Sequence, residues 1–481
     1  MTQEYDPESI ESNALVKRTS NGLITSKGRR SQISLTSDII KAAAISRASS
    51  QVLVDESWMQ EIWDWADKFG IDEQTMPRNR IELLKLNAIK IIHEVIDVLP
   101  DSIGNLSNLK SLNIKYSEFT SLPESIGNLS NLELLKATHG KLNSLPESIG
   151  NLSNLKELHV NNNYLTLLPE SIGNLVNLEK LYIRRNIITS LPEDIGKLHN
   201  LESLNAGSNR LTSLPESIGN LSNLKELHLD VFHHYCLTKT IENSKASKPV
   251  YVNSNNIVSL PESIGNLVNL KELDVEGNNL TSLPESIGNL SNLKELHVIG
   301  NNLISLPESI GSLSSLDSLS VTDNKLTSLP KSIVDLVNLK RLSVSINQLT
   351  SLPESIGDLS NLKSLGLGSN SLTSLPDSIG NLINLEILNI DNNNLTSLPE
   401  SIGNLSSVES IDLSNNNFTS LPESIENLIN LQSLNIDYSE FTSLPENIGN
   451  LSNLSYISIV DTNITSLPQT IDQTKVHIYR E

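Results

Sequence analysis

Residues 293–301 read L-K-E-L-H-V-I-G-N, and this short stretch decides the fold. Leucine, leucine and valine occupy its first, fourth and sixth positions, and asparagine occupies its ninth. Four apolar residues and a proline follow at fixed offsets, at Leu303, Leu306, Pro307, Ile310 and Leu313. Aligned on the proline, the same frame recurs every 23 residues over most of the chain. Such a period predicts a solenoid, in which each repeat packs against its neighbours.

The first frame begins at Leu86 and the last at Leu454, and a period of 23 residues places 17 repeats over this span. The interval from Pro215 to Pro261 is 46 residues, which is twice the period. We therefore predict a solenoid over residues 86–475, with one degenerate repeat at about residues 228–252.

The spacing within one repeat predicts its structure. Leu296 and Val298 alternate with polar residues, as expected for a strand with one face in the core. The amide of Asn301 can donate to and accept from exposed backbone groups at the end of that strand. Pro307 restricts φ, and we expect Gly311 to permit a tight reversal of the chain. Strands about 4.8 Å apart predict an inner strip roughly 80 Å long.

The recurring stretch S-L-P-E-S-I-G-N-L-S-N-L-K-E-L resembles the 23-residue leucine-rich repeats of the Ras-suppressor type. Plant intracellular Ras-group-related proteins and many bacterial proteins share this repeat class. The resemblance implies an α/β solenoid, a right-handed horseshoe with a parallel sheet on its concave face and a helical N-terminal cap. Because family members mostly bind other proteins, it also implies a non-enzymatic protein–protein interaction scaffold whose concave face binds a protein partner.

The N-terminal residues predict a tail and a cap. Residues 1–34 are polar and rich in serine and threonine, and we expect them to be disordered. Within residues 35–85, helices are predicted at 37–48 and at about 56–69. The second helix carries one apolar stripe, formed by Trp58, Ile62, Trp65 and Phe69. We interpret its tryptophans as a lid over the first repeat, and alternatively as a partner-binding surface. At the other end, residues 476–481 predict a terminal strand.

The degenerate repeat keeps apolar residues at core positions, at Leu237, Ile241, Val250 and Val252, but lacks the Leu-Pro pair and the glycine. It also contains residues of metal-binding type, namely His228, Asp230, His233, His234 and Cys236. Their spacing matches no standard zinc pattern, so we predict no metal site. His159, His228 and His297 share one strand position but are three repeats apart, too far to bind one ion. The segment is interpreted either as a decayed, flexible repeat or as a break that widens the curve or contacts a partner.

Composition excludes several classes of function. The net charge of −21 argues against non-specific binding to nucleic acid or to an anionic membrane, and the lack of a run of about 18 apolar residues argues against membrane insertion. A single cysteine, Cys236, excludes an intrachain disulfide framework and favours a reducing compartment. No phosphate-binding glycine loop, zinc spacing or nucleophile elbow is present, so we expect no catalysis and no cofactor. We predict a cytoplasmic monomer. The alternative is a bacterial effector, secreted by a specialised system into a host cell, that binds host signalling proteins.

Specificity is expected at the strand positions that face outward, which are the third, fifth, seventh and eighth of each repeat. Up to the repeat beginning at Leu178 these positions are mainly basic or aromatic, with Glu157 as the exception. From the repeat beginning at Leu224 the acidic residues at these positions far outnumber lysine and arginine, of which Arg341 is the single example. This polarity is interpreted as a device that orients an elongated partner, or as drift among solvated positions. The candidate partner-binding residues are Lys136, His159, Lys180, Tyr182, Arg184, Arg185, Asp230, Glu272, Asp274 and Glu276, with Tyr182, Arg184 and Arg185 as the principal contacts.

Overall fold

The computed structural model describes residues 56–92, 96–230 and 255–480. The chain divides into two units, Met1–Ser57 and Trp58–Glu481, and the elements described here lie in the second apart from Ser57. The predicted tail at residues 1–34, the helix at 37–48 and most of the degenerate repeat lie outside the described residues.

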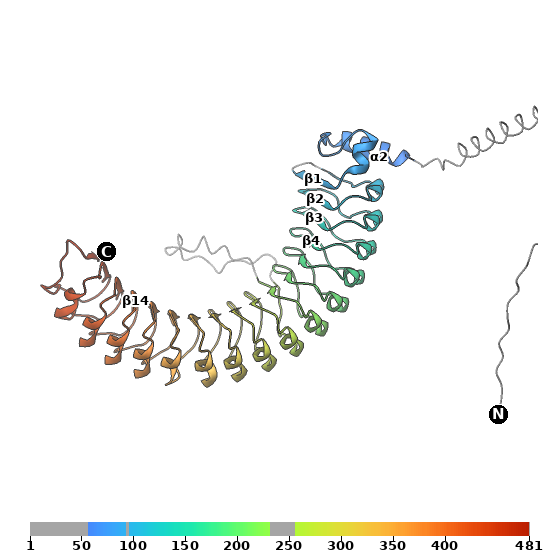
Figure 1. Ribbon diagram of the computed structural model, residues 1–481. Coiled ribbons are helices and arrows are strands. Elements are labelled where there is room, and N and C mark those ends of the chain that lie inside the picture. The colour runs from blue at the N-terminus through green and yellow to red at the C-terminus, as the bar shows by residue number, and fades with distance from the viewer. Residues whose placement is uncertain (1–55, 93–95, 231–254, 481) are drawn as a thin grey trace, which may run out of the picture. The chain divides into compact units, whose positions relative to one another are not determined.

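A parallel sheet extends from β1 to β17 within the second unit and confirms the predicted open solenoid. Each strand pairs with the next one along the chain, as β8 does with β9, where Glu272 faces Glu295. Figure 1 shows the strands on the inner side of a curved body. The strands are β1 (Ala88–Ile92), β2 (Ser111–Lys115), β3 (Leu134–Thr138), β4 (Glu157–His159), β5 (Lys180–Tyr182), β6 (Ser203–Asn205), β7 (Glu226–His228), β8 (Glu272–Asp274), β9 (Glu295–His297), β10 (Ser318–Ser320), β11 (Arg341–Ser343), β12 (Ser364–Gly366), β13 (Ile387–Asn389), β14 (Ser410–Asp412), β15 (Ser433–Asn435), β16 (Tyr456–Ser458) and β17 (His477–Tyr479).

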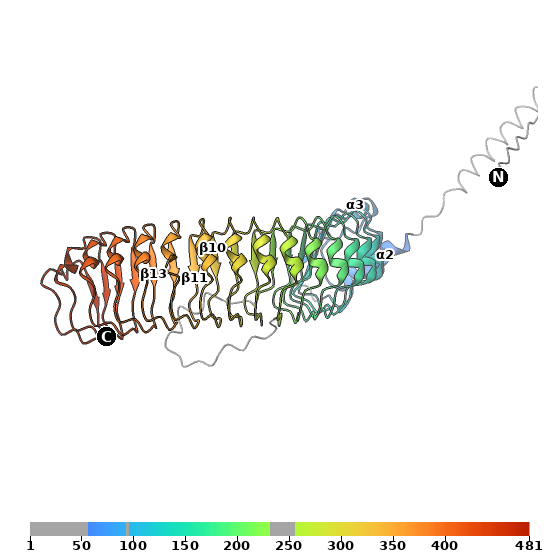
Figure 2. The same ribbon diagram turned by 90° about the horizontal axis from the view of Figure 1, so that it is seen from below.

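Short 3-10 helices form the convex side, and Figure 2 shows them side by side along the outer face. Most begin directly after the proline of their repeat, whose φ near −70° suits the residue before a helix, as Pro307 does with φ −69°. They are η1 (Asp101–Asn105), η2 (Glu124–Asn128), η3 (Glu147–Asn151), η4 (Glu170–Asn174), η5 (Glu193–Lys197), η6 (Glu216–Asn220), η8 (Glu262–Asn266), η9 (Glu285–Asn289), η10 (Glu308–Ser312), η11 (Lys331–Asp335), η12 (Ile356–Asp358), η13 (Asp377–Asn381), η14 (Glu400–Asn404), η15 (Glu423–Asn427) and η16 (Glu446–Asn450).

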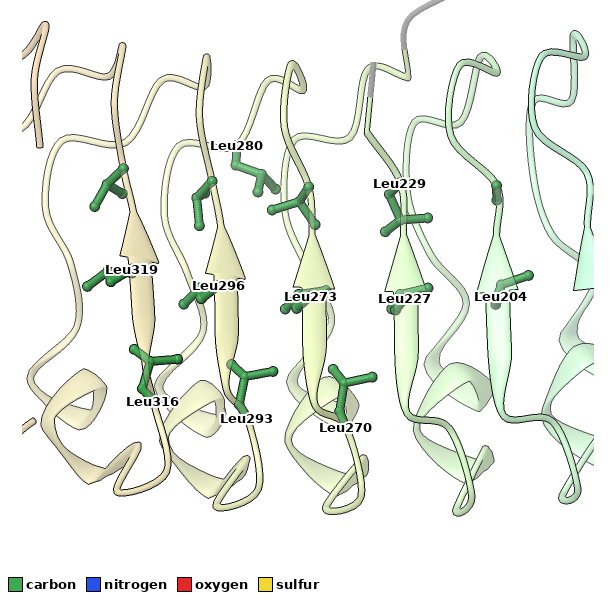
Figure 3. Packing of buried hydrophobic residues seen from close by; sticks show 14 of the residues in the cluster. Leu204, Leu227, Leu229, Leu270, Leu273, Leu280, Leu293, Leu296, Leu316 and Leu319 are labelled. Atoms are coloured by element: carbon green, nitrogen blue, oxygen red, sulfur yellow. The ribbon is translucent and has the colours of Figure 1, made fainter. Parts of the chain in front are cut away.

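The core is the stack of repeated leucines between the sheet and these turns. Leu296, Val298 and Leu303 are fully buried, as the spacing predicts. Figure 3 shows corresponding leucines in rows that run from repeat to repeat. A single repeat lacks the partners to bury them, so the stacking itself provides the hydrophobic stabilisation.

A ladder of buried asparagines ties the end of each strand to its neighbours, as predicted. The Asn301 Nδ2 donates to the carbonyls of Val298 (3.2 Å) and Val275 (3.0 Å), the latter in the preceding repeat. Its Oδ1 accepts from the Leu280 backbone N–H at 3.0 Å. The amide thus satisfies backbone groups that would otherwise be buried without a partner at this turn.

The glycine that recurs in most of the turns has a different role from the one predicted. The prediction that Gly311 permits a tight reversal is wrong, because its φ does not lie in the left-handed region. A Cβ at Gly311 would instead lie 2.4 Å from the Ser332 carbonyl oxygen and 2.7 Å from the Ser332 Cβ. The glycine is needed because the next repeat packs directly against it.

Two helices cover the first repeat. They are α2 (Ser57–Lys68), close to the predicted bounds, and α3 (Arg80–Lys85). Trp65 is buried in the core, and its Nε1 donates to the Val98 carbonyl at 2.7 Å. Gly70, with φ +67°, lies just beyond the end of α2 in the conformation typical of a helix C-terminus. The helical cap is therefore attached to the first repeat both by apolar packing and by a hydrogen bond.

The prediction of 17 stacked repeats, one of them degenerate, is wrong at residues 228–252. Strand β7 pairs directly with β8, with His228 opposite Asp274, so no strand lies between them. Asn255 takes the ladder position of the repeat that begins at Leu224, since its Nδ2 donates to the Leu229 carbonyl at 2.9 Å. Residues 231–254 thus interrupt one repeat just before its asparagine. Figure 3 shows the consequence, with Leu227 and Leu273 as neighbours in one row.

Candidate binding surface on the concave sheet

Outward-facing side chains of the strands form the concave surface. On β9, Glu295 and His297 are partly exposed, whereas Leu296 between them is buried. Beyond the strands the backbone enters the left-handed region, as at His139 (φ 59°) and Arg185 (φ 54°). Bulky residues rarely adopt this backbone conformation, so the repeat imposes it at these positions. The conformation fixes these side chains at the edge of the sheet. Residues at the same position in neighbouring strands, whether the third, fifth or seventh, are about 4.8 Å apart along the surface.

The first half of the surface carries what we call the basic region, formed by Lys90, Lys115, Lys136, His139, His159, Lys180, Tyr182 and Arg185. Aromatic rings and imidazoles pair across neighbouring strands within it. The ring centroids of Tyr116 and His139 are 5.2 Å apart, and those of His159 and Tyr182 are 4.6 Å apart. Burial lowers the pKa of His139, and the charges of Lys115 and Arg185 lower it further. The imidazole pKa thus reports the positive potential of this region.

Glu157 is the acidic exception in the basic region, and the structure shows why it fits there. Its carboxylate accepts from the Lys180 Nζ at 3.0 Å and lies 2.9 Å from the His159 Nε2. Burial opposes ionisation, but the hydrogen bonds from Lys180 and His159 prevail and lower the pKa of Glu157. Two of the predicted partner-binding residues, His159 and Lys180, therefore share one carboxylate within the chain.

Arg184 and Asp230, both predicted to contact a partner, bind one another. The guanidinium Nη1 and Nη2 donate to the two carboxylate oxygens at 3.1 and 2.7 Å. Their side chains are only 20% and 12% exposed. A partner that binds Arg184 must compete with this bidentate pair.

Direct pairing of β7 with β8 assembles an acidic cluster, which we define as Asp230, Glu272, Asp274 and Glu276. Burial raises the pKa of Asp274 to about 6, with a further contribution from the charge of Asp230. Burial raises the pKa of Glu276 to about 8, and the charges of Asp274 and Asp230 add to it. Sequence reasoning placed Asp230 and Glu276 two repeats apart and so missed this cluster. Asn255 could have revealed the cluster from the sequence, because the repeat pattern resumes at this asparagine.

The surface has a shallow hollow of about 430 Å³ that begins at the acidic cluster. Glu272, Asp274 and Glu276 line one side, and Arg341 lines the other. Its lining also includes several serines, among them Ser318, Ser320 and Ser343. The hollow can hold a side chain of a protein partner and offers both signs of charge to it.

Comparison with known proteins agrees with the repeat pattern. A family model described as a leucine-rich repeat region matches residues 73–187, 250–325 and 354–437, which is more than half of the chain. A second model, described as a leucine rich repeat, matches residues 176–231 and 314–372. The chain belongs to the leucine-rich repeat family. None of the curated protein sequences matches it.

Solved structures with the same fold include one from a bacterium. A leucine-rich repeat protein of Leptospira interrogans is 33% identical with a TM-score of 0.71, and the alignment covers 83% of this chain and 98% of that one. The leucine-rich repeat ectodomain of a membrane receptor kinase from Arabidopsis thaliana, in complex with Casparian strip integrity factor 2, is 29% identical with a TM-score of 0.56. That alignment covers 81% of this chain and 49% of the ectodomain chain. Among residues 56–92, 96–230 and 255–480, no helix combines the length and the hydropathy that crossing a bilayer requires.

Proposed function

We propose that this chain is a non-enzymatic scaffold that binds a protein partner on its concave face and acts as a cytoplasmic monomer. The observation that carries the proposal is the contrast between the two kinds of position in each repeat. Core leucines and ladder asparagines recur almost unchanged, whereas the outward positions of neighbouring strands differ in charge and size. A rigid stack that presents variable side chains on one preformed surface has the properties of a binding surface.

Charge separation on this surface supports a partner that lies along it in one direction. The basic region extends from β1 to β5, and the acidic cluster follows at β7 and β8. A partner segment with complementary charges would be favoured in one orientation and repelled in the other. Tyr182 and Arg185 are residue types that often dominate binding energy at interfaces, and both lie in the basic region.

The similarity to the plant receptor ectodomain also supports the proposal, because that ectodomain was solved in complex with Casparian strip integrity factor 2. Leucine-rich repeat proteins in general mediate protein–protein interaction, which agrees with a concave binding surface here.

The experiment compares two double variants of equal charge change. Lys136→Glu with Arg185→Glu reverses two concave charges, whereas Lys325→Glu with Lys331→Glu reverses two charges outside the basic region. Partners captured by the wild-type chain and identified by mass spectrometry are titrated against each variant. We expect the concave variant to bind at least about tenfold more weakly and the control to bind like wild type. Equal affinity of both variants would refute concave-face binding.

An exported bacterial effector is the alternative within the same class. Its support is the polar, serine-rich composition of residues 1–34, which lie outside the described residues. The binding surface would then act on host signalling proteins. A reporter fused to residues 1–50 separates the two cases, since export into host cells supports the effector and retention supports a cytoplasmic scaffold.

A further inference from the structure

Histidine and carboxylate side chains meet on the concave face where β7 pairs with β8. His228 lies opposite Asp274, and Asp274 lies opposite His297 on the next strand. The sequence-based expectation that His228 and His297 are three repeats apart is therefore wrong, because residues 231–254 do not separate their strands. One ligand atom from each of His228, Asp230 and Asp274 lies within 4.8 Å of the other two.

We propose that His228, Asp230 and Asp274 bind a divalent transition-metal ion such as Zn²⁺. One imidazole nitrogen and two carboxylate oxygens form a donor set that suits Zn²⁺ and Co²⁺. Zinc holds such ligands at about 2.0–2.2 Å, which places tetrahedral ligand atoms roughly 3.4 Å from one another. The side chains approach this arrangement, and small rotations about their χ angles would complete it.

Neighbouring groups hold the two carboxylates in place, as the outer partners of metal ligands commonly do. Arg184 donates to both oxygens of Asp230, and each oxygen keeps a further lone pair for a metal. The backbone N–H of Glu276 donates to the Asp274 Oδ1 at 3.0 Å. The Glu272 carboxylate lies 3.8 Å from the His228 Nδ1. Hydrogen bonds to both carboxylates thus restrict their rotation before an ion arrives.

The charge balance also favours a cation. Arg184 contributes one positive charge to a cluster in which Asp230 and Glu276 are each 8% exposed. A divalent ion would add to this positive charge beside the side chains of Asp230 and Asp274. Calcium and magnesium prefer sites made only of oxygen, so the imidazole of His228 favours a transition metal over them.

Three protein ligands leave at least one coordination position for water or for a donor atom of another molecule. The site lies on the concave face, so that position is directed toward the surface on which we propose that a partner binds. Metal binding itself does not depend on that proposal, since it is measured on the isolated chain.

The test is calorimetric titration of the full chain with ZnCl₂ after removal of metal by EDTA, with the Co²⁺ absorption spectrum as a second readout. His228→Ala and Asp274→Asn each remove one ligand, and Asp274→Asn keeps an acceptor for the Glu276 N–H. The matched control is His159→Ala, which removes a histidine at the same strand position that also lies 2.9 Å from a carboxylate. Thermal melting without metal verifies that each variant is folded.

We expect one equivalent of Zn²⁺ to bind to wild type and to His159→Ala, and binding at least about tenfold weaker in both ligand variants. CaCl₂ at the same concentration should give no heat of binding. Absence of Zn²⁺ binding up to about 1 mM, the weakest affinity that would count as a site, would overturn the proposal. So would unchanged binding by His228→Ala and Asp274→Asn. Loss of binding only in a variant with His233→Ala, His234→Ala and Cys236→Ser would also overturn it, because the ion would then belong to those residues.

Discussion

The guanidinium of Arg184 binds both carboxylate oxygens of Asp230, a residue 46 positions further along the chain. The two side chains come from repeats that are separated by the one containing β6, which has Gly207 at the corresponding position. A Cβ at Gly207 would lie 2.6 Å from the Asp230 carbonyl oxygen and 2.8 Å from its Oδ1. The missing side chain leaves room for the pair, which joins the basic region to the acidic cluster.

Breaking this pair should destabilise the fold measurably. Asp230→Ala is expected to lower the free energy of unfolding by about 3–5 kcal/mol, because it removes the compensating charge from a mostly buried guanidinium. Arg184→Ala combined with Asp230→Ala should cost less than the sum of the single changes. Urea unfolding followed by circular dichroism in EDTA measures both quantities.

The control for that prediction is the exposed pair of Lys197 and Asp194, whose charged atoms are 2.6 Å apart on the convex side. Asp194→Ala should cost less than about 1 kcal/mol because water screens this pair. Equal losses for Asp194→Ala and Asp230→Ala would contradict the importance of burial.

Gly311→Ala tests the packing explanation of the repeated glycine. We expect a loss of about 1–3 kcal/mol in the free energy of unfolding, because the added Cβ would collide with Ser332. At an unconstrained position the same change would stabilise the chain by restricting its unfolded state. A raised urea midpoint for Gly311→Ala would therefore contradict the explanation.

The next repeat offers a natural comparison, since Val334 occupies the same position. The turn that follows, η12, begins at Ile356 and spans three residues, whereas η10 and η11 span five. Val334→Ala should cost less than about 1.5 kcal/mol, as the deletion of methyl groups from a partly buried site does.

Asn301→Ala should destabilise the ladder by about 2–4 kcal/mol, since it leaves buried backbone groups of Val275 and Leu280 without the side-chain amide. Asn292, the last residue of the preceding repeat, is the matched control. Its Nδ2 donates to the Val268 carbonyl at 2.8 Å in an exposed setting, where water can replace it. Asn292→Ala should cost no more than about 1 kcal/mol. Comparable urea midpoints for Asn301→Ala and Asn292→Ala would show that the asparagine ladder contributes little to the free energy of unfolding.

The pKa of His139 reports the potential of the basic region. Burial and the charges of Lys115 and Arg185 lower it from 6.5. The folded chain therefore binds a proton at His139 less readily than the unfolded chain does. As a result, the free energy of unfolding is highest above pH 6.5 and decreases as the pH falls from 6.5 through the folded-state pKa. NMR titration of the ring should show a higher pKa in Lys115→Met and an unchanged one in Lys325→Met. No change in Lys115→Met would contradict the predicted coupling.

Local periodicity was sufficient to predict the parts of the fold that repeat. Leu296, Val298 and Asn301 have the expected burial and contacts because their positions depend only on the repeat itself and its neighbours. The cap helix around Trp65 was also predicted, since its apolar stripe has helical spacing.

The interruption at residues 231–254 could not be predicted from the period. In an uninterrupted frame the ladder asparagine would fall at position 232, which holds phenylalanine, and Asn255 takes that role 23 residues later. An insertion as long as one repeat leaves every later proline at the position that the 23-residue period predicts. In the sequence it therefore resembles a degenerate repeat. The Arg184–Asp230 pair has the spacing of two repeats, but the acidic cluster depends on the direct pairing of β7 with β8, which no local pattern contains.

The adjacency of β7 and β8 is the central claim, because it creates both the acidic cluster and the proposed metal site. Cysteines at Glu226 and Glu272, in a chain with Cys236→Ser, test it directly, since these residues are register partners. Their Cα atoms should be about 4.8 Å apart, within the range that a disulfide spans. A second pair at Glu226 and Glu295, two strands apart, should not form a disulfide. Complete oxidation of the first pair alone is the predicted result, and failure of the first pair to oxidise would contradict the account.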